Sequence, residues 1–184
     1  SVIVSPVSND IIGSSMLILG IDPGTATTGF GLIRLQKGKT QLEKFGLIET
    51  DKNGSPGNRF ISIEKQMLSL FRQFRPDIMA MERLFFAANA KTAMSVGQAQ
   101  GVMLLAAAKS QVEVVQIAPG TVKKTIAGNG RADKKAVQKA VRKVLGAKVR
   151  SGPKKRTHFD NAADALAVAL TYAYTYSEGG EKIG

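Results

Sequence analysis

The chain has 184 residues, with 26 Lys and Arg against 14 Asp and Glu, one His and no Cys. This length suits one compact domain, and the composition excludes disulfide scaffolds, thiolate metal sites and multi-histidine zinc sites. No apolar run approaches the roughly 20 residues that a membrane-spanning helix needs, so we expect a cytoplasmic protein with no membrane association.

The folded domain is expected over residues 16–176. Met16 directly precedes a strong apolar run, so residues 1–15 are interpreted as a flexible N-terminal extension or a remnant of cloning. Residues 177–184 are expected to form a flexible C-terminal tail.

The first part of this domain predicts a β-meander followed by one helix. Apolar runs predict three strands, at residues 17–22, 28–35 and 41–50. Residues 51–58 are rich in Gly, Asn and Pro and predict a loop. An apolar stripe with helical spacing then runs from Ile61 to Phe74, and Pro76 ends it.

The second part alternates strands and helices. Further strands are predicted at 77–81 and 112–117, and helices at 89–109, about 132–145, and 160–176, the last with acidic residues in its first turn. Pro119 suits the first turn of another helix, and residues 146–157 predict a basic loop. Three sequential strands followed by this alternation predict an α/β fold with a five-stranded mixed sheet and helices on both faces.

The positive charge is concentrated in one segment. Residues 123–156 contain 13 basic residues and one acid, whereas the rest of the chain contains 13 of each. A run of charge is usually a solvated face, but an excess confined to one part of a neutral domain is better explained by a polyanionic partner. Nucleic acid is the expected partner.

Three acidic residues fall where they can meet. Asp22 and Glu82 end the first and fourth predicted strands, and Asp164 lies one turn into the last predicted helix. Taken alone, Asp22 is explained as a turn residue, Glu82 as a lone surface acid, and the nearby Asp160 as a helix cap. The small residues around Asp164 would let its helix lie close to the sheet. Clustered carboxylates repel one another unless a divalent cation neutralises them, and hard oxygen ligands favour Mg²⁺ or Mn²⁺.

Five sequence blocks resemble, in order and spacing, those of the RuvC family of Holliday-junction resolvases, the crossover junction endodeoxyribonucleases. The resemblance extends from about Leu17 to Tyr174. The blocks are residues 19–33 (LGIDPGTATTGFGLI), 81–86 with 89–93 (MERLFF and NAKTA), 97–101 (GQAQG), 122–130 (VKKTIAGNG) and 162–167 (AADALA).

The resemblance implies an RNase H-like fold and a homodimeric nuclease of DNA recombination and repair. Such an enzyme binds a four-way junction and cuts two opposed strands symmetrically, leaving 5′-phosphate and 3′-hydroxyl ends. It implies two Mg²⁺ ions per active site, with Mn²⁺ as a substitute, and a branch-migration helicase as a partner. Asp22, Glu82 and Asp164 match the family's catalytic and metal-binding acids.

The fourth metal ligand departs from the family pattern. The family has Asp or, in some members, His at the position that Asn161 occupies here. An Asn keeps one carbonyl oxygen but lacks the charge, so the chain as given is expected to be catalytically impaired. Asp160 and His158 are the candidate substitute ligands, although a lone His near a helix start is more often a surface or packing residue.

The resemblance also implies a set of DNA contacts. Basic residues are expected to bind phosphates, and two aromatic residues match rings that lie at the junction crossover, where a Phe can stack on an unpaired base. Core packing is the alternative for each ring, and Phe85 is the stronger candidate. The expected DNA-binding residues are Lys123, Lys134, Lys124, Arg131, Phe85 and Phe86.

Two other functions remain open. One is a non-catalytic junction-binding protein on the same fold, which the departure at Asn161 favours. The other is an actin-like phosphate-binding ATPase, because residues 22–28 resemble a phosphate loop of that class. That class carries a duplicated domain, for which this chain has no room.

Overall fold

The computed structural model describes residues 15–84, 90–146 and 156–177. Five strands and five helices are described in these ranges. In chain order they are β1 (Met16–Asp22), β2 (Thr27–Gln36), β3 (Lys39–Glu49), α1 (Pro56–Phe74), β4 (Ile78–Glu82), α2 (Ala90–Lys109), β5 (Glu113–Ile117), α3 (Pro119–Ala127), α4 (Lys134–Leu145) and α5 (Arg156–Ser177). Of the predicted extension at 1–15 and tail at 177–184, residues 1–14 and 178–184 lie outside the described residues, and Ser177 is the last residue of α5.

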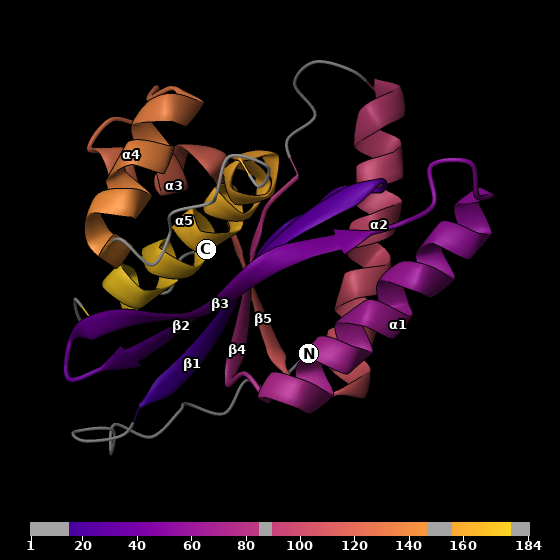
Figure 1. The fold of residues 1–184 in the computed structure, drawn as a ribbon, viewed down its shortest axis with the longest axis horizontal. Coiled ribbons are helices and arrows are strands. Elements are labelled where there is room, and N and C mark those ends of the chain that lie inside the picture. Colours follow the sequence, from indigo (N-terminus) through magenta and orange to yellow (C-terminus); the bar gives the residue numbers. More distant parts are fainter. Residues whose placement is uncertain (1–14, 85–89, 147–155, 178–184) are drawn as a thin grey trace, which may run out of the picture.

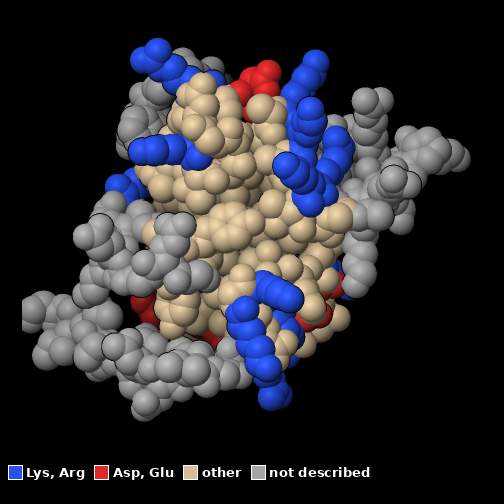
Figure 2. All heavy atoms as spheres, turned by 90° about the vertical axis from the view of Figure 1, so that its left-hand side faces the viewer, with Lys and Arg blue, Asp and Glu red and all other residues tan. Residues whose placement is uncertain are grey.

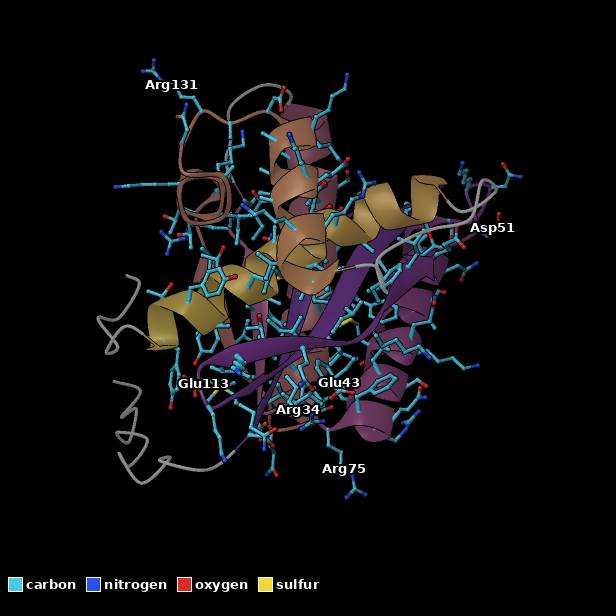
Figure 3. The ribbon with its side chains drawn as sticks, turned by 60° about the vertical axis from the view of Figure 1, so that its left-hand side comes forward. Arg34, Glu43, Asp51, Arg75, Glu113 and Arg131 are labelled. Carbon is cyan, nitrogen blue, oxygen red and sulfur yellow. The ribbon has the colours of Figure 1, made fainter. Side chains whose placement is uncertain are left out.

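The strands form one mixed sheet in the order β3-β2-β1-β4-β5. The meander is antiparallel, with Ile18 opposite Ile33, whereas β4 runs parallel to both β1 and β5. On the meander, Arg34 Nε and Glu43 Oε1 lie 2.6 Å apart and pair β2 with β3 (Figure 3). Because β1 and β4 are parallel neighbours, Asp22 and Glu82 end at the same edge of the sheet.

Helices cover both faces of the sheet, as the sequence predicted. Helices α1 and α2 lie on one side, and α3, α4 and α5 lie on the other (Figure 1). Each side has its own apolar core: Met67 and Met103 belong to the first, and Val141 and Leu166 to the second. Helix α5 is mostly buried over residues 162–173 and packs on β1 and β2.

Two helices begin earlier than predicted. The loop predicted to end at Asn58 ends at Ser55, because the Ser55 hydroxyl caps α1 by accepting from Asn58 N at 3.3 Å, and Pro56 suits the first turn. Helix α5 begins at Arg156 rather than Asp160.

The early start of α5 overturns a prediction about its charge. No acid lies in the first turn of this helix, and Asp164 lies two turns from its start rather than one. The acidic residues therefore receive little help from the helix dipole, which acts mainly within the first turn. No helix in the described ranges is long and apolar enough to cross a bilayer.

Candidate active site

Asp22, Glu82 and Asp164, here called the acid cluster, come from three separate elements. Asp22 is the last residue of β1, Glu82 is the last residue of β4, and Asp164 lies on α5. Asp22 interacts electrostatically with both other carboxylates, and Glu82 interacts with Asp164. The structure thus brings together the three acids that the sequence singled out.

Glycines in the sheet explain how α5 brings Asp164 to this edge. A Cβ atom on Gly20 of β1 would lie 2.0 Å from the carbonyl oxygen of Ala165. A Cβ atom on Gly31 of β2 would lie 2.4 Å from Leu166 Cδ2. Any side chain at either position would therefore push the helix away. The helix rests directly on the strands, and Asp164 immediately precedes the residues in contact.

Burial and mutual repulsion disfavour charge on the acid cluster. Burial, and then the nearby charges of Asp164 and Glu82, together raise the pKa of Asp22 from 3.8 to about 7. Burial and the charge of Asp164 also raise the pKa of Glu82. A site that keeps carboxylates in so unfavourable a place is a functional candidate, because structural acids are usually solvated or paired.

Two lysines interact with the acid cluster. Lys134 Nζ lies 2.6 Å from Asp164 Oδ2, and Lys134 also lowers the pKa of Asp22 and Glu82. Lys123, on α3, lowers the pKa of Glu82. The two lysines predicted to bind phosphate thus lie next to the acids predicted to do the chemistry.

The chemistry of the acid cluster suits a hard divalent cation. Its oxygens are the ligands that Mg²⁺ prefers, and a dication would relieve the repulsion that raises the pKa of Asp22 and Glu82. Among the described residues, however, no three acidic, His or Cys side chains are already gathered closely enough to enclose an ion. The acids therefore interact with one another without forming a complete metal coordination shell.

The remaining basic residues of α3, α4 and the turn between them form a separate exposed region, here called the basic surface. Figure 2 looks onto this side of the molecule, where Lys and Arg side chains border the face and few acids are visible. Arg131 points outward from the turn before α4 (Figure 3), and Lys124 lines a surface hollow together with Tyr174. The exposed members are Lys124, Arg131, Lys135, Lys139, Arg142 and Lys143.

Several predicted site residues cannot be placed. Phe85 and Phe86 lie outside the described residues. Helix α5 includes positions 158, 160 and 161. The side chains of His158, Asp160 and Asn161 lie outside the described part. Their roles stay predictions.

Two polar residues that the sequence analysis missed support the site. The Thr28 hydroxyl donates to the Gly24 carbonyl at 2.8 Å and accepts from Gly24 N at 3.2 Å, so it closes the turn after Asp22. Gln100 Nε2 donates to the Glu82 carbonyl at 2.8 Å. Both side chains are buried, Thr28 1 % and Gln100 7 % exposed. The sequence signal that could have identified Thr28 and Gln100 is a polar residue on a face that is otherwise buried.

Comparisons with known proteins agree with this geometry. The family model for crossover junction endodeoxyribonuclease RuvC matches residues 18–172. A relative of that name from Moorella thermoacetica is 44 % identical over 158 residues, which cover 86 % of this chain and 91 % of the relative.

Solved structures give the same result. The Thermus thermophilus RuvC structure superposes with a TM-score of 0.78 at 35 % identity and covers 91 % of this chain and 99 % of its own. T. thermophilus RuvC in complex with a Holliday junction substrate also superposes with a TM-score of 0.78, at 33 % identity, over 89 % of this chain and 96 % of its own. These matches favour the nuclease family over the actin-like ATPase alternative. The chain belongs to the RuvC family of crossover junction endodeoxyribonucleases.

Proposed function

We propose that this protein resolves four-way DNA junctions by metal-dependent hydrolysis of two opposed strands. One observation carries the proposal: three carboxylates from three elements, Asp22, Glu82 and Asp164, interact with one another beside a concentrated basic region. The T. thermophilus relative, whose structure was solved with a Holliday junction substrate, supports the choice of DNA substrate.

The acid cluster is proposed to hold two Mg²⁺ ions, with Mn²⁺ as a substitute. Asp22, Glu82 and Asp164 would supply most of the ligand oxygens, and Asn161, or Asp160 or His158 in its place, would supply another. When bound, the ions supply an activated water and charge stabilisation for the leaving 3′ oxygen. The products would carry 5′-phosphate and 3′-hydroxyl ends.

The protein's own residues would position the scissile phosphate. Lys123 and Lys134 border the acid cluster, so their ammonium groups can bind phosphate oxygens beside the reacting bond. Lys134 would then exchange its contact with Asp164 for one with DNA. The basic surface would bind the arms of the junction without reading sequence.

A homodimer is proposed through the exposed side of α2. Met94, Leu104 and Leu105 are 67 %, 36 % and 51 % exposed. Gly101 lies seven residues after Met94 and three and four residues before the two leucines, so these residues share one side of the helix. On the same side, a Cβ atom on exposed Gly101 would meet nothing within 4 Å, which leaves room for close approach by a partner. A second copy of this chain is the proposed occupant, because symmetric cutting of two strands requires two active sites. Leu104→Glu together with Leu105→Glu should yield monomers in light scattering.

Three finer proposals follow from the family. Phe85, and less strongly Phe86, would stack on a base opened at the crossover. A branch-migration helicase is the proposed partner, and the cytoplasm is the proposed compartment.

The proposal is tested with a synthetic four-way junction and a linear duplex of the same sequence. With Mg²⁺ the junction should be cut on two opposed strands, and the duplex should stay intact. Binding of the junction without cutting, in both this chain and its Asn161→Asp form, would favour the non-catalytic alternative. Hydrolysis of ATP without cutting would favour the ATPase.

A further inference from the structure

The carbonyl group of the last residue of β4 accepts a hydrogen bond from a side chain of α2. Glu82 is the last residue of β4, and its carbonyl oxygen accepts from Gln100 Nε2 at 2.8 Å. Gln100 lies on α2, 18 residues further along the chain. Only the amide nitrogen can make this bond, because the carbonyl oxygen of Glu82 is an acceptor.

The surroundings make this contact stronger than a surface hydrogen bond. Gln100 is only 7 % exposed, so water has little access to replace its amide. One helical turn away, Gly97 faces Leu84, since a Cβ atom added to Gly97 would be 3.6 Å from Leu84 Cδ2. One face of α2 thus meets the chain on both sides of the point where it leaves the sheet.

The position of the Glu82 carboxylate depends on this backbone. The same Glu82–Arg83 peptide is also held by the sheet, because Arg83 N donates to the Ile117 carbonyl at 2.8 Å, so Gln100 fixes the other end of this peptide. Without Gln100, the Glu82 carbonyl would lose its donor and would turn toward water to find another. A turn of this peptide moves the Cα–Cβ direction of Glu82, and with it the carboxylate.

We propose that Gln100 is a positioning residue, which fixes the end of β4 and thereby aims the Glu82 carboxylate at the acid cluster. The inference rests on the proposed function of Glu82. Helix α2 presents its exposed apolar side, with Met94 and Leu105, away from this contact. The same helix therefore links the proposed dimer surface to the proposed active site.

The chain contains a matched control for the test. Gln66 Nε2 of α1 donates to the carbonyl of Glu49 at 2.9 Å, and Glu49 is the last residue of β3. Both glutamines therefore bind the carbonyl of a strand-ending Glu. Glu49 is exposed and does not belong to the acid cluster. The Gln66 bond is exposed, so Gln66→Met controls for the loss of a glutamine donor at a strand end that lies outside the acid cluster.

The experiment compares Gln100→Met with Gln66→Met, since Met keeps the length of the side chain and removes the donor. Junction affinity in Ca²⁺, the single-turnover rate at saturating junction, and its dependence on Mg²⁺ concentration are measured. Gln100→Met should lower the saturated rate roughly 10–100-fold, the usual range for loss of an outer partner of a metal ligand. It should also raise the Mg²⁺ concentration needed for half the maximal rate and weaken Mn²⁺ binding in electron paramagnetic resonance, with junction affinity unchanged. Gln66→Met should leave all four values unchanged.

Two further variants keep the result decisive. Gln100→Asn retains a polar amide but shortens the side chain by one methylene, so it should show the same defects if Gln100→Met does not fold. Glu82→Gln is measured in parallel. If Glu82→Gln stops cleavage while folded Gln100 variants behave like Gln66→Met, the positioning role is wrong and the proposed active site stands. If Glu82→Gln cleaves normally, the proposed active site itself is wrong.

Discussion

The acid cluster and the basic surface differ in how firmly the fold holds them. Asp22, Glu82 and Asp164 come from packed elements, and glycines at 20 and 31 let α5 pack directly against the sheet. The exposed lysines of α4, by contrast, reach into solvent from one face of a single helix. Burial raises the pKa of Asp22 and Glu82, whereas exposed charges stay well solvated.

This contrast matches a division between chemistry and binding. Chemistry requires a few charges held at unfavourable but fixed positions, so each should be indispensable. Binding to a phosphate backbone draws on many interchangeable charges, so each should contribute little and depend on salt. Four changes to the chain test this division, and they follow in order of decreasing expected effect.

Removing one charge from the acid cluster should have the largest effect. Glu82→Gln or Asp164→Asn should lower the single-turnover cleavage rate by more than about a hundredfold, since loss of an outer partner alone costs roughly 10–100-fold. Junction affinity should stay the same or rise slightly, because negative charge near the phosphates is removed. A gel assay for cleavage and anisotropy for binding, both on one labelled junction, separate the two. Loss of both together would contradict the division.

Adding a negative charge at the fourth ligand position should raise the cleavage rate. Asn161→Asp is expected to raise Mg²⁺-dependent cleavage substantially, because a carboxylate helps to concentrate the dication and to lower the pKa of its bound water. Cleavage rates are compared with those of Asp160→Asn across Mg²⁺ concentrations. Equal rates for this chain and Asn161→Asp, with loss only in Asp160→Asn, would identify Asp160 as the ligand.

Charge reversal near the acids should have a moderate effect on binding. Lys123→Glu and Lys134→Glu should each weaken junction affinity and reduce the slope of log affinity against log salt by about 0.9 for each phosphate that the protein no longer neutralises. Lys65→Glu, an exposed position on α1 across the sheet, makes the same change of charge and is the control. Equal weakening at all three positions would mean that net charge alone drives binding.

The smallest expected effect is on stability without metal. The pKa of Asp22 is raised from 3.8 to about 7 in the folded protein, so the folded state favours the protonated form. Its contribution to stability is complete below 3.8 and is lost as pH rises to about 7. Asp22→Asn should therefore raise the melting temperature above about pH 7 by a few degrees, and this gain should vanish near pH 3.8. Added Mg²⁺ should stabilise the unaltered chain more than the variant.

The sequence predicted the sheet and the acid cluster because both follow from short-range patterns. Apolar runs mark the strands, and Asp22 and Glu82 stand directly at strand ends, where parallel neighbours share an edge. Small residues around Asp164 correctly predicted close packing, and the structure adds Gly20 and Gly31 as their partners on the sheet.

The sequence was less informative where distant residues decide the outcome. The start of α5 was misplaced because Asp160 resembled a helix-start acid, whereas the helix begins at Arg156. On α4, Val144 is 41 % exposed and Gln138 is buried, so residue type alone does not mark the buried face of this helix. The bond from Gln100 to Glu82 joins residues on different elements and has no periodic pattern in the sequence.

The sharpest test of the division between chemistry and binding is to raise the junction concentration until each variant is saturated. Lys139→Glu on the basic surface should then recover the cleavage rate of the unaltered chain, because its defect is one of affinity. Glu82→Gln should stay inactive at every concentration, because its defect lies in the chemical step. Failure of Lys139→Glu to recover, or recovery of Glu82→Gln, would contradict the assignment of chemistry to the acid cluster.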